Sequence, residues 1–191
     1  MNWATKNLVR LALFALIGAT TIFISVADAK TTETIPGKSA GAQDFDFEFG
    51  NWRVRHRLKR PSGEWVEFEG TSSDRALNDG SANVEENTFH RPTGDTQGIA
   101  LRTFDRKTGL WAIWWVDSRD PHGALDPPVK GRFVDGVGTF YSDGVVNGKT
   151  QRTRFIWSHI TSASARWEQA FSLDEGKTWD TNWVMEFKRT P

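Results

Sequence analysis

Two adjacent carboxylates, Glu85 and Glu86, are the side chains in this sequence best placed for acid–base chemistry. Successive side chains of a β-strand point to opposite faces, so we expect one carboxylate to face the interior and the other to face solvent. An inward carboxylate is costly without a partner, and Arg102, Arg132 or Arg154 could supply the opposite charge. The alternative is that both carboxylates lie at a solvated edge. Such a carboxylate, acting beside an arginine that clamps an anion, would indicate an enzyme.

Other reactive constellations are missing from the sequence. It has no cysteine, which excludes disulfides, thiolate nucleophiles, zinc ribbons and iron–sulfur clusters. There is no GxSxG motif and no glycine-rich phosphate loop. We therefore predict no catalytic constellation, no metal and no cofactor, and the sequence leaves open whether the protein is an enzyme. The four histidines are not spaced as metal ligands; they are His56, His90, His122 and His159.

Charge excludes two further classes of function. The 191 residues contain 24 basic and 24 acidic side chains, and the isoelectric point is about 6.9. A general nucleic-acid binder needs a basic surface, and a protein held on an anionic membrane needs a polybasic segment. We expect neither a nucleic acid nor a membrane surface as the partner.

The first 29 residues have the three-part order of a secretory signal peptide. Lys6 and Arg10 precede an uncharged run over 11–26, and Ala27-Asp28-Ala29 follows as an A-x-A cleavage site. An uncleaved anchor is the alternative, but the run is shorter than the roughly 20 residues that span a bilayer. We predict cleavage after Ala29, a periplasmic or secreted protein with no membrane association, and a flexible tether over 30–43. Export without cysteine is typical of a bacterial periplasm.

Residues 44–191 predict one all-β domain. Apolar and polar side chains alternate with period two, and turn residues interrupt them every few positions, as in a sandwich or barrel. The first strand changes parity at Gly50-Asn51, which predicts a bulge or bend. Connections are short except for 119–128, and consecutive hairpins favour a ten-stranded antiparallel up-and-down barrel over a Greek-key sandwich. The strands that follow the first are expected at 65–76, 82–89, 99–105, 110–118, 129–134, 137–141, 150–160, 165–173 and 179–189.

Five turns have explicit chemistry. The segment 172–179 has the S-x-D-x-G-x-T-W pattern of an Asp-box hairpin, which we interpret as structural because a propeller needs repeated copies. The other four supply residues that tolerate positive φ, as tight hairpins require. They are Pro61-Ser62-Gly63, Asn78-Asp79-Gly80, Asp135-Gly136 and Asp143-Gly144.

The pattern of tryptophans predicts an aromatic interior, but it does not decide which face of the strand over 110–118 points inward. Residues 110–116 are apolar on both faces, so either Trp111 and Trp115 or Trp114 points outward. An outward tryptophan face suggests a homodimer. In the last hairpin we expect an inward row in which Gln169 and Thr181 need polar partners, whether each other, a water or a ligand. That row is Trp167, Gln169, Phe171, Trp179, Thr181, Trp183, Met185 and Phe187.

The chain resembles the lipocalin and calycin group, because Gly50-Asn51-Trp52 matches the GxW with which that group's first strand begins. It is most similar to a bacterial lipocalin-like family of unknown function, over about 44–189. The resemblance implies a closed barrel with an apolar pocket, and Trp52 packed at the closed end near Arg189. The haem ligand of nitrobindins has no counterpart after His159, and the interior Arg and Tyr of fatty-acid carriers are not matched. The segments that carry the resemblance are 46–52, 111–119, 127–131 and 167–187.

The leading hypothesis is an exported barrel that binds a small, largely apolar molecule in its interior. Tryptophans would supply stacking area, Gln169 a hydrogen bond and one arginine a counter-charge. The alternatives are an enzyme that uses a carboxylate at the barrel mouth, and an envelope interaction module with a filled barrel and a working outer face at Trp114 or Trp111. The candidate ligand-binding residues are Arg102, Trp115, Arg154, Trp167, Gln169 and Trp183.

Overall fold

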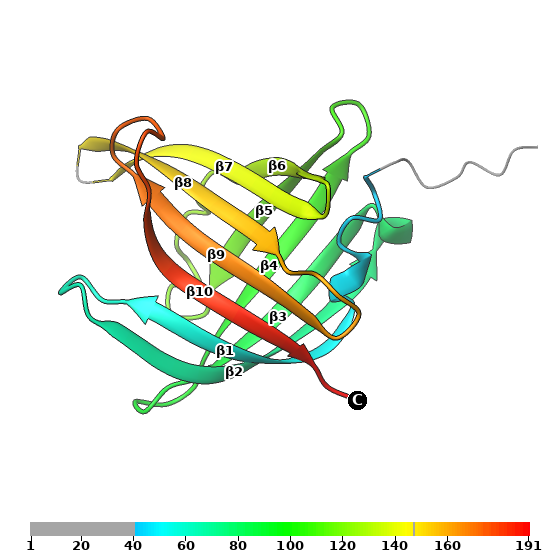
Figure 1. The fold of residues 1–191 in the computed structure, drawn as a ribbon, viewed down its shortest axis with the longest axis horizontal. Coiled ribbons are helices and arrows are strands. Elements are labelled where there is room, and N and C mark those ends of the chain that lie inside the picture. The colour runs from blue at the N-terminus through cyan, green and yellow to red at the C-terminus, as the bar shows by residue number, and fades with distance from the viewer. Residues whose placement is uncertain (1–40, 147) are drawn as a thin grey trace, which may run out of the picture. The chain divides into compact units, whose positions relative to one another are not determined.

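A computed structural model describes residues 41–146 and 148–191. The predicted signal peptide and most of the predicted tether lie outside the described residues. The described chain is a closed barrel of ten antiparallel strands (Figure 1), with two 3-10 turns, η1 (Asp46–Glu48) and η2 (Asn78–Gly80). The strands are β1 (Gly50–Lys59), β2 (Trp65–Leu77), β3 (Ala82–His90), β4 (Thr96–Asp105), β5 (Leu110–Asp117), β6 (Val129–Val134), β7 (Val137–Val146), β8 (Lys149–Ser158), β9 (Ser164–Ser172) and β10 (Asp180–Arg189).

Each strand pairs with its neighbour in sequence, and the first and last strands close the sheet. β1 and β10 pair from Trp52 opposite Arg189 to Leu58 opposite Trp183. This confirms the predicted up-and-down barrel and excludes the sandwich. Closure removes the free edges that an open sheet of this size would expose. No helix within 41–146 or 148–191 is long and apolar enough to cross a membrane.

The alternation along the strands follows the sheet's two faces. On β1, Trp52, Val54 and His56 are buried, whereas the intervening arginines are exposed. β4 turns Gly98, Ala100, Arg102 and Phe104 inward. Apolar side chains therefore fill the interior, and charged side chains cover the exterior.

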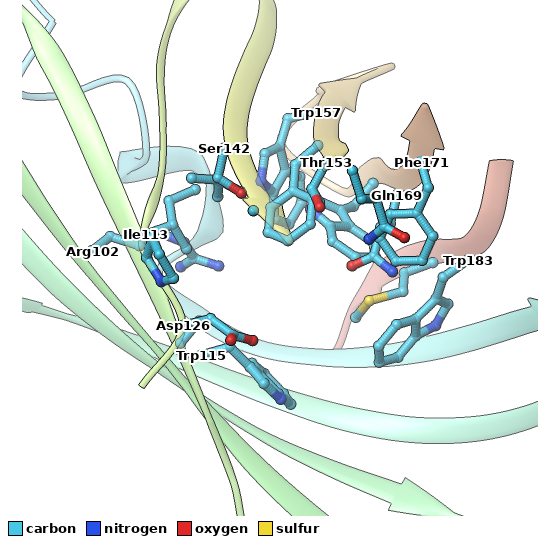
Figure 2. Close-up of a pocket in the computed structure, with 18 of the residues that line it drawn as sticks. Arg102, Ile113, Trp115, Asp126, Ser142, Thr153, Trp157, Gln169, Phe171 and Trp183 are labelled. Carbon is cyan, nitrogen blue, oxygen red and sulfur yellow. The ribbon is translucent and has the colours of Figure 1, made fainter. Parts of the chain in front are cut away.

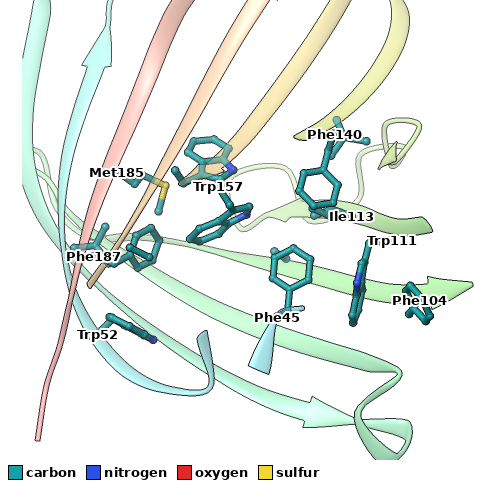
Figure 3. Packing of buried hydrophobic residues seen from close by; sticks show 14 of the residues in the cluster. Phe45, Trp52, Phe104, Trp111, Ile113, Phe140, Trp157, Met185 and Phe187 are labelled. Atoms are coloured by element: carbon teal, nitrogen blue, oxygen red, sulfur yellow. The ribbon is translucent and has the colours of Figure 1, made fainter. Parts of the chain in front are cut away.

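The segment before β1 differs from the expected strand. Residues 46–48 form η1, and β1 begins only at Gly50, whose φ is +111°. The alternating phenylalanines therefore do not line a strand. Phe45 instead enters one end of the barrel, where its ring lies 5.0 Å from that of Trp111 and 6.2 Å from that of Trp157 (Figure 3). Residues 45–48 therefore form a plug at this end of the barrel. Over so few residues, the plug has the same period-two pattern as a strand.

Packing with the barrel also begins before residue 44. Ala42 is buried in the core, and the Trp111 indole donates a hydrogen bond to the Gly41 carbonyl over 2.9 Å. The last residues assigned to the tether are therefore part of the folded domain. Their short side chains fit beside Phe104, which lies within about 3 Å of where a Cβ on Gly41 would stand.

Trp52 seals the same end of the barrel through the edge and one face of its indole ring. Its indole donates to the Glu48 carbonyl at 2.5 Å, and the Arg189 guanidinium lies 4.1 Å above its ring. Arg189 also donates to the backbone carbonyls of Phe47 and Phe49, at 2.5 and 2.6 Å. The placement of Trp52 and Arg189 that the family resemblance implies is confirmed.

Four of the five predicted turns are present where expected. Asp135 and Gly136 both have positive φ, at +49° and +78°, as a two-residue hairpin requires. In the Asp-box hairpin the Ser172 hydroxyl donates to Asp174, and the Thr178 amide donates to the same carboxylate. The predicted turn at Asp143-Gly144 is wrong. Both residues lie inside β7, paired with Arg152 and Gln151, because cross-strand pairing overrides a local turn signal.

The structure resolves which face of each aromatic strand is inward. Trp111 is buried and Trp115 packs against the core, so Trp114 faces outward. In β10 the pairing register shifts between Thr181 and Trp183. This bulge reverses parity, so Trp183, Met185 and Phe187 point inward as predicted, whereas the ring of Trp179 lies outside, 5.9 Å from that of Tyr141.

Candidate functional site

The barrel encloses a cavity of about 430 Å³ between its packed closed end and the long β5–β6 loop (Figure 2). Eight aromatic side chains line it, namely Phe89, Trp115, Phe155, Trp157, Trp167, Phe171, Trp183 and Phe187. This volume is within the range of small-molecule sites, about 300–1,000 Å³. β5 and β6 pair over only three residue positions, and residues 114–117 of β5 have no β6 partner. The loop residues Asp126 and Pro127 cover this side of the cavity.

Five of the six candidate site residues line this cavity. Figure 2 shows Gln169 and Trp183 on one side, and Arg102 and Trp115 across from them. Small residues on β4 make room for the Trp115 indole, because a Cβ on Gly98 would stand 2.1 Å from its Cζ2. The five residues are Arg102, Trp115, Trp167, Gln169 and Trp183.

Arg154 is the candidate that does not reach the cavity. Alternate residues of β8, Gln151, Thr153 and Phe155, point inward, which turns Arg154 to the outer face. Its guanidinium stacks on Trp179 at 4.2 Å. Strict alternation could not predict the bulge in β10 that turns Trp179 outward. Because Trp179 points outward, it can stack with Arg154.

Gln169 has a polar partner, although not the one its strand position suggested. Its amide donates to the Asn182 side-chain oxygen over 3.1 Å. Asn182 lies at the β10 register shift, where an extra residue is inserted opposite β9. Thr181 pairs with Ala170 instead. The amide of Gln169 is therefore held in position at the cavity wall.

A buried ionic cluster forms the floor of the cavity around Arg102. The guanidinium donates to Asp74 at 2.6 Å from one terminal nitrogen, and to Glu85 from the other. Glu48 also accepts from it, at 3.1 Å. The four charged residues are at most 3% exposed. Glu85 is the inward member of the adjacent carboxylate pair, and Arg102 is the arginine that neutralises it.

Neutral side chains complete the cluster. Asn83 accepts from Arg102 over 3.0 Å, and the Ser72 hydroxyl donates to Glu85 over 2.8 Å. Ser72 and Asp74 come from β2, Asn83 and Glu85 from β3, Arg102 from β4, and Glu48 from η1. Three adjacent strands and the plug thus meet at one guanidinium.

One arginine cannot balance three ionised carboxylates in a dry interior. Burial, and repulsion by Glu85 and Asp74, raise the pKa of Glu48 well above its ordinary value despite the attraction of Arg102. Burial likewise raises the pKa of Asp74 to about 7. The pKa of Arg102 is raised, because the carboxylates outweigh its own desolvation. The cluster therefore retains protons at neutral pH, and its arginine stays charged.

The carboxyl groups with raised pKa do not border the cavity. Glu85 and Arg102 line it, whereas Glu48 and Asp74 lie behind them. Within the described residues, no group of three or more His, Asp or Glu side chains is arranged to hold a metal ion. The Arg102 guanidinium occupies the centre of the three carboxylates, where such an ion would otherwise sit.

A second cavity of about 250 Å³ adjoins the first near the β3–β4 loop. The two share Phe89, Trp115, Gln169 and Trp183 as a common wall. The second cavity contains Arg91, which stacks on Phe68 and Phe89 at 4.9 and 5.7 Å. It also contains Arg119, whose guanidinium is held by Asp117 at 2.5 Å.

Sequence reasoning missed Glu48, Asp74, Asn83 and Asn87 as parts of this site. Asn83, Glu85 and Asn87 alternate along one strand, and this polar spacing was the available signal. Asp74 lies in a similarly alternating polar stretch of β2. Glu48 had no comparable signal, because it reaches Arg102 from a 3-10 turn and not from a strand.

Comparison with known proteins shows the fold and not a family. No family model matches the chain, and no curated protein matches its sequence. Among solved structures it is similar to an S-type phycobiliprotein lyase from Guillardia theta, at 9% identity and a TM-score of 0.53, over 77% of this chain and 90% of that one. A de novo designed fluorescence-activating β-barrel matches at 13% identity and a TM-score of 0.41, over 80% and 98% of the two chains. The fold and the site define a closed antiparallel barrel with an internal cavity.

Proposed function

We propose that this protein binds a small, largely apolar ligand inside its barrel, as an exported member of the lipocalin-like group. The observation that carries the proposal is the 430 Å³ cavity with its aromatic wall. The proposed binding residues are Trp115, Trp167 and Trp183 for stacking and Gln169 for a hydrogen bond, with Arg102 in the floor. A cavity of this size also argues against an interaction module with a filled barrel.

The enzyme alternative has weaker support. The two carboxyl groups of the cluster whose pKa is raised, Glu48 and Asp74, are shielded from the cavity by Arg102 and Glu85. Glu85 itself is engaged by Ser72 and Arg102. An acid or base must reach the substrate's reacting atoms. The similar phycobiliprotein lyase shows that an enzyme can have this fold, so the likeness does not favour a carrier over an enzyme.

Interior binding is tested by filling the cavity. Thr153 lines the cavity, whereas Thr150 on the same strand is exposed. We expect wild-type protein purified from a periplasm to release a small molecule on organic extraction, detected by native mass spectrometry. Thr153→Trp should abolish this and the tryptophan fluorescence response to a library of apolar and aromatic compounds, and Thr150→Trp should preserve both. Absence of any ligand or response in the wild type would refute the proposal.

Export is a separate part of the proposal, and it has its own test. Cleavage after Ala29 would leave a chain that begins at Lys30. Expression of the full chain in a bacterium should place it in the periplasmic fraction, with an intact mass that corresponds to 30–191. A full-length mass in the membrane fraction would instead indicate an uncleaved anchor.

Pairing of two copies through the outward tryptophan face also remains a proposal. Trp114 lies on the outer face beside Leu101, its β4 partner, and Ile99 lies further along that strand. Leu101 and Ile99 are 38% and 41% exposed. Light scattering at high micromolar concentration should give a dimer mass that Leu101→Glu converts to a monomer mass. A monomer mass for the wild type would contradict the proposal.

A further inference from the structure

The inward face of β3 carries a strip of polar side chains into a cavity that is rich in aromatic residues. Asn83, Glu85 and Asn87 are all buried along this face, and Phe89 continues it toward the second cavity. Glu85 and Asn87 line the main cavity. The strip therefore adds to Gln169 as a polar surface that a ligand in the cavity can contact.

Asn87 presents an unsatisfied hydrogen-bond acceptor at this surface. Its side chain is only 4% exposed, and its Oδ1 is buried without a partner. A buried acceptor without a donor is destabilising, so a donor supplied from the cavity would be favoured. The neighbouring Glu85 carboxylate is an acceptor as well, and of its roughly four lone-pair sites three are used by Ser72, Arg102 and a hydrogen bond with Glu48.

Arg102 is poorly placed to attract an anion despite its charge. Its terminal nitrogens donate to Asp74, Asn83, Glu48 and Glu85, which leaves the buried Nε hydrogen without a partner. A bidentate grip on a carboxylate needs two parallel N–H groups, and no free pair remains. With Glu85 ionised, the cluster is neutral or negative in each protonation state of Glu48 and Asp74.

The part of the cavity near the β5–β6 loop and β7 also carries negatively charged side chains. Asp126 and Asp143 line it there, and Figure 2 shows Asp126 beside Trp115. Asp143 has a partial partner in Arg152, 3.4 Å away, and both side chains are solvent-exposed. The indole faces of Trp115 and Trp183 add a surface that attracts cations.

Two further arginines belong to the second cavity. Arg91 and Arg119 lie beyond the shared wall of Trp115 and Trp183. Arg119 is already paired with Asp117, and Arg91 faces the rings of Phe68 and Phe89. The aromatic wall thus separates an acidic main cavity from a smaller compartment that contains arginine.

We infer that the main cavity selects an aromatic ligand that bears an N–H donor or a positive charge, with that group directed to Glu85 and Asn87, and that it discriminates against carboxylates. The inference deepens the proposed function and depends on it. It names a chemical class, which includes aromatic amines and protonated nitrogen heterocycles, and it excludes fatty acids as preferred ligands.

The test uses four compounds with one apolar body in calorimetric titrations at pH 7.5. They are 2-(1-naphthyl)ethylamine, 2-(1-naphthyl)ethanol, 1-naphthaleneacetic acid and 1-methylnaphthalene. We expect the amine to bind at least about tenfold more tightly than the acid, which corresponds to the 1.4 kcal/mol that separates one decade in affinity. The alcohol should fall between them, because it can donate to Asn87 but carries no charge.

Two adjacent carboxylates provide a matched pair of variants. Glu85→Gln should weaken binding of the amine about tenfold and leave the alcohol unchanged, whereas Glu86→Gln should change neither, because Glu86 is exposed on the outer face. Asn87→Leu should weaken both the amine and the alcohol. Circular dichroism and a thermal melt establish that each variant is folded.

The outcomes separate the inferred ligand class from interior binding itself. Acid binding as tight as amine binding, or amine binding unchanged in both Glu85→Gln and Asn87→Leu, would overturn the inferred class but not interior binding. Acid binding that Arg91→Gln abolishes would also overturn it, by placing the anion in the second cavity. Binding of 1-methylnaphthalene alone would refute the class and support the cavity. Failure of all four compounds to bind would overturn the inferred class, and the periplasmic extraction and the compound library would then decide interior binding.

Discussion

At the scale of single residues, Arg102 determines the chemistry of the interior. Three carboxylates converge on its guanidinium in a site that is almost fully buried. A buried charge is tolerated when it is paired and hydrogen-bonded, and removal of one partner leaves the others uncompensated. We therefore expect the stability of the barrel to depend on this cluster, which also forms the floor of the cavity.

Replacement of Arg102 by methionine should be strongly destabilising. It leaves Glu48, Asp74 and Glu85 without their shared cation, so we expect a loss of about 3–5 kcal/mol in the free energy of unfolding. Arg132→Met is the control, because Arg132 is exposed on β6. Urea unfolding measures both. Equal stability of Arg102→Met and wild type would contradict the assigned role of the cluster.

The raised pKa of Asp74, about 7, predicts a pH dependence of known sign. The folded protein holds this proton more tightly than the unfolded chain, whose Asp has a pKa near 3.8. The contribution to stability is therefore complete below about pH 4 and is lost as the pH rises toward 7. It changes by up to about 1.4 kcal/mol per pH unit.

The measurement is the difference in unfolding free energy between wild type and Asp74→Asn, from urea titrations between pH 4 and 7. This difference should fall as the pH rises. His56 acts in the opposite direction, because burial lowers its pKa to about 3, but it is present in both proteins and cancels. A difference that is constant with pH would show that Asp74 does not titrate in this window.

At the scale of elements, small residues on β4 create the space that large residues on β5 occupy. Gly98 faces the Trp115 indole so closely that any side chain would meet it. Ala100, the next inward residue, also lines the cavity. The bulge in β10 acts similarly, because it sets which of Trp179 and Trp183 points inward. Cavity shape thus depends on pairs of strands and not on one strand alone.

Gly98→Ala should displace Trp115 from the cavity wall. A methyl group 2.1 Å from Cζ2 cannot be accommodated without movement, and overpacking of this kind costs about 1–3 kcal/mol. Gly144→Ala is the control, because its Cβ would meet nothing within 4 Å and its φ is not positive. Thermal melts and the tryptophan emission maximum should change for Gly98→Ala alone. An unchanged emission spectrum would contradict the proposed packing.

At the scale of the whole molecule, the closed end depends on contacts between residues far apart in the chain. Arg189 at the end of β10 stacks on Trp52 and donates to carbonyls of the segment that precedes β1. It also donates to the Ser162 carbonyl in the β8–β9 connection, at 2.7 Å. One side chain therefore joins the strand pair that closes the barrel, the N-terminal plug and a loop.

Arg189→Ala should weaken closure without altering the cavity. Charged hydrogen bonds contribute about 1.5–3 kcal/mol each and an exposed cation–π contact about 0.5–1 kcal/mol, so we expect a net loss of about 2–4 kcal/mol. Arg53→Ala, on the exposed face of β1, is the control. Hydrogen exchange should show faster exchange at the β1–β10 pair in the first variant. Protection equal to wild type would refute the role of Arg189.

Much of this architecture was predictable because it follows from local rules. Alternation along strands such as β1 and β4, and turns such as Asp135-Gly136, are properties of a few consecutive residues. That one of Glu85 and Glu86 points inward follows from the same alternation, whereas the structure shows that the inward one is Glu85. Errors arose where the alternation is interrupted, at the plug around Phe45 and at the β10 bulge, because an inserted residue or a 3-10 turn leaves no distinct composition.

The amino-acid sequence alone was sufficient for the strand number, the hairpin order and the presence of an aromatic interior, since period-two patterning and turn chemistry act over short distances. It was insufficient for the cluster around Arg102 and for the position of Arg154. Those depend on register across several strands, where a shift of one residue turns a side chain to the other face. Pairing of β2, β3 and β4 brings Asp74, Glu85 and Arg102 together, and η1 adds Glu48. No single segment of the sequence contains this arrangement.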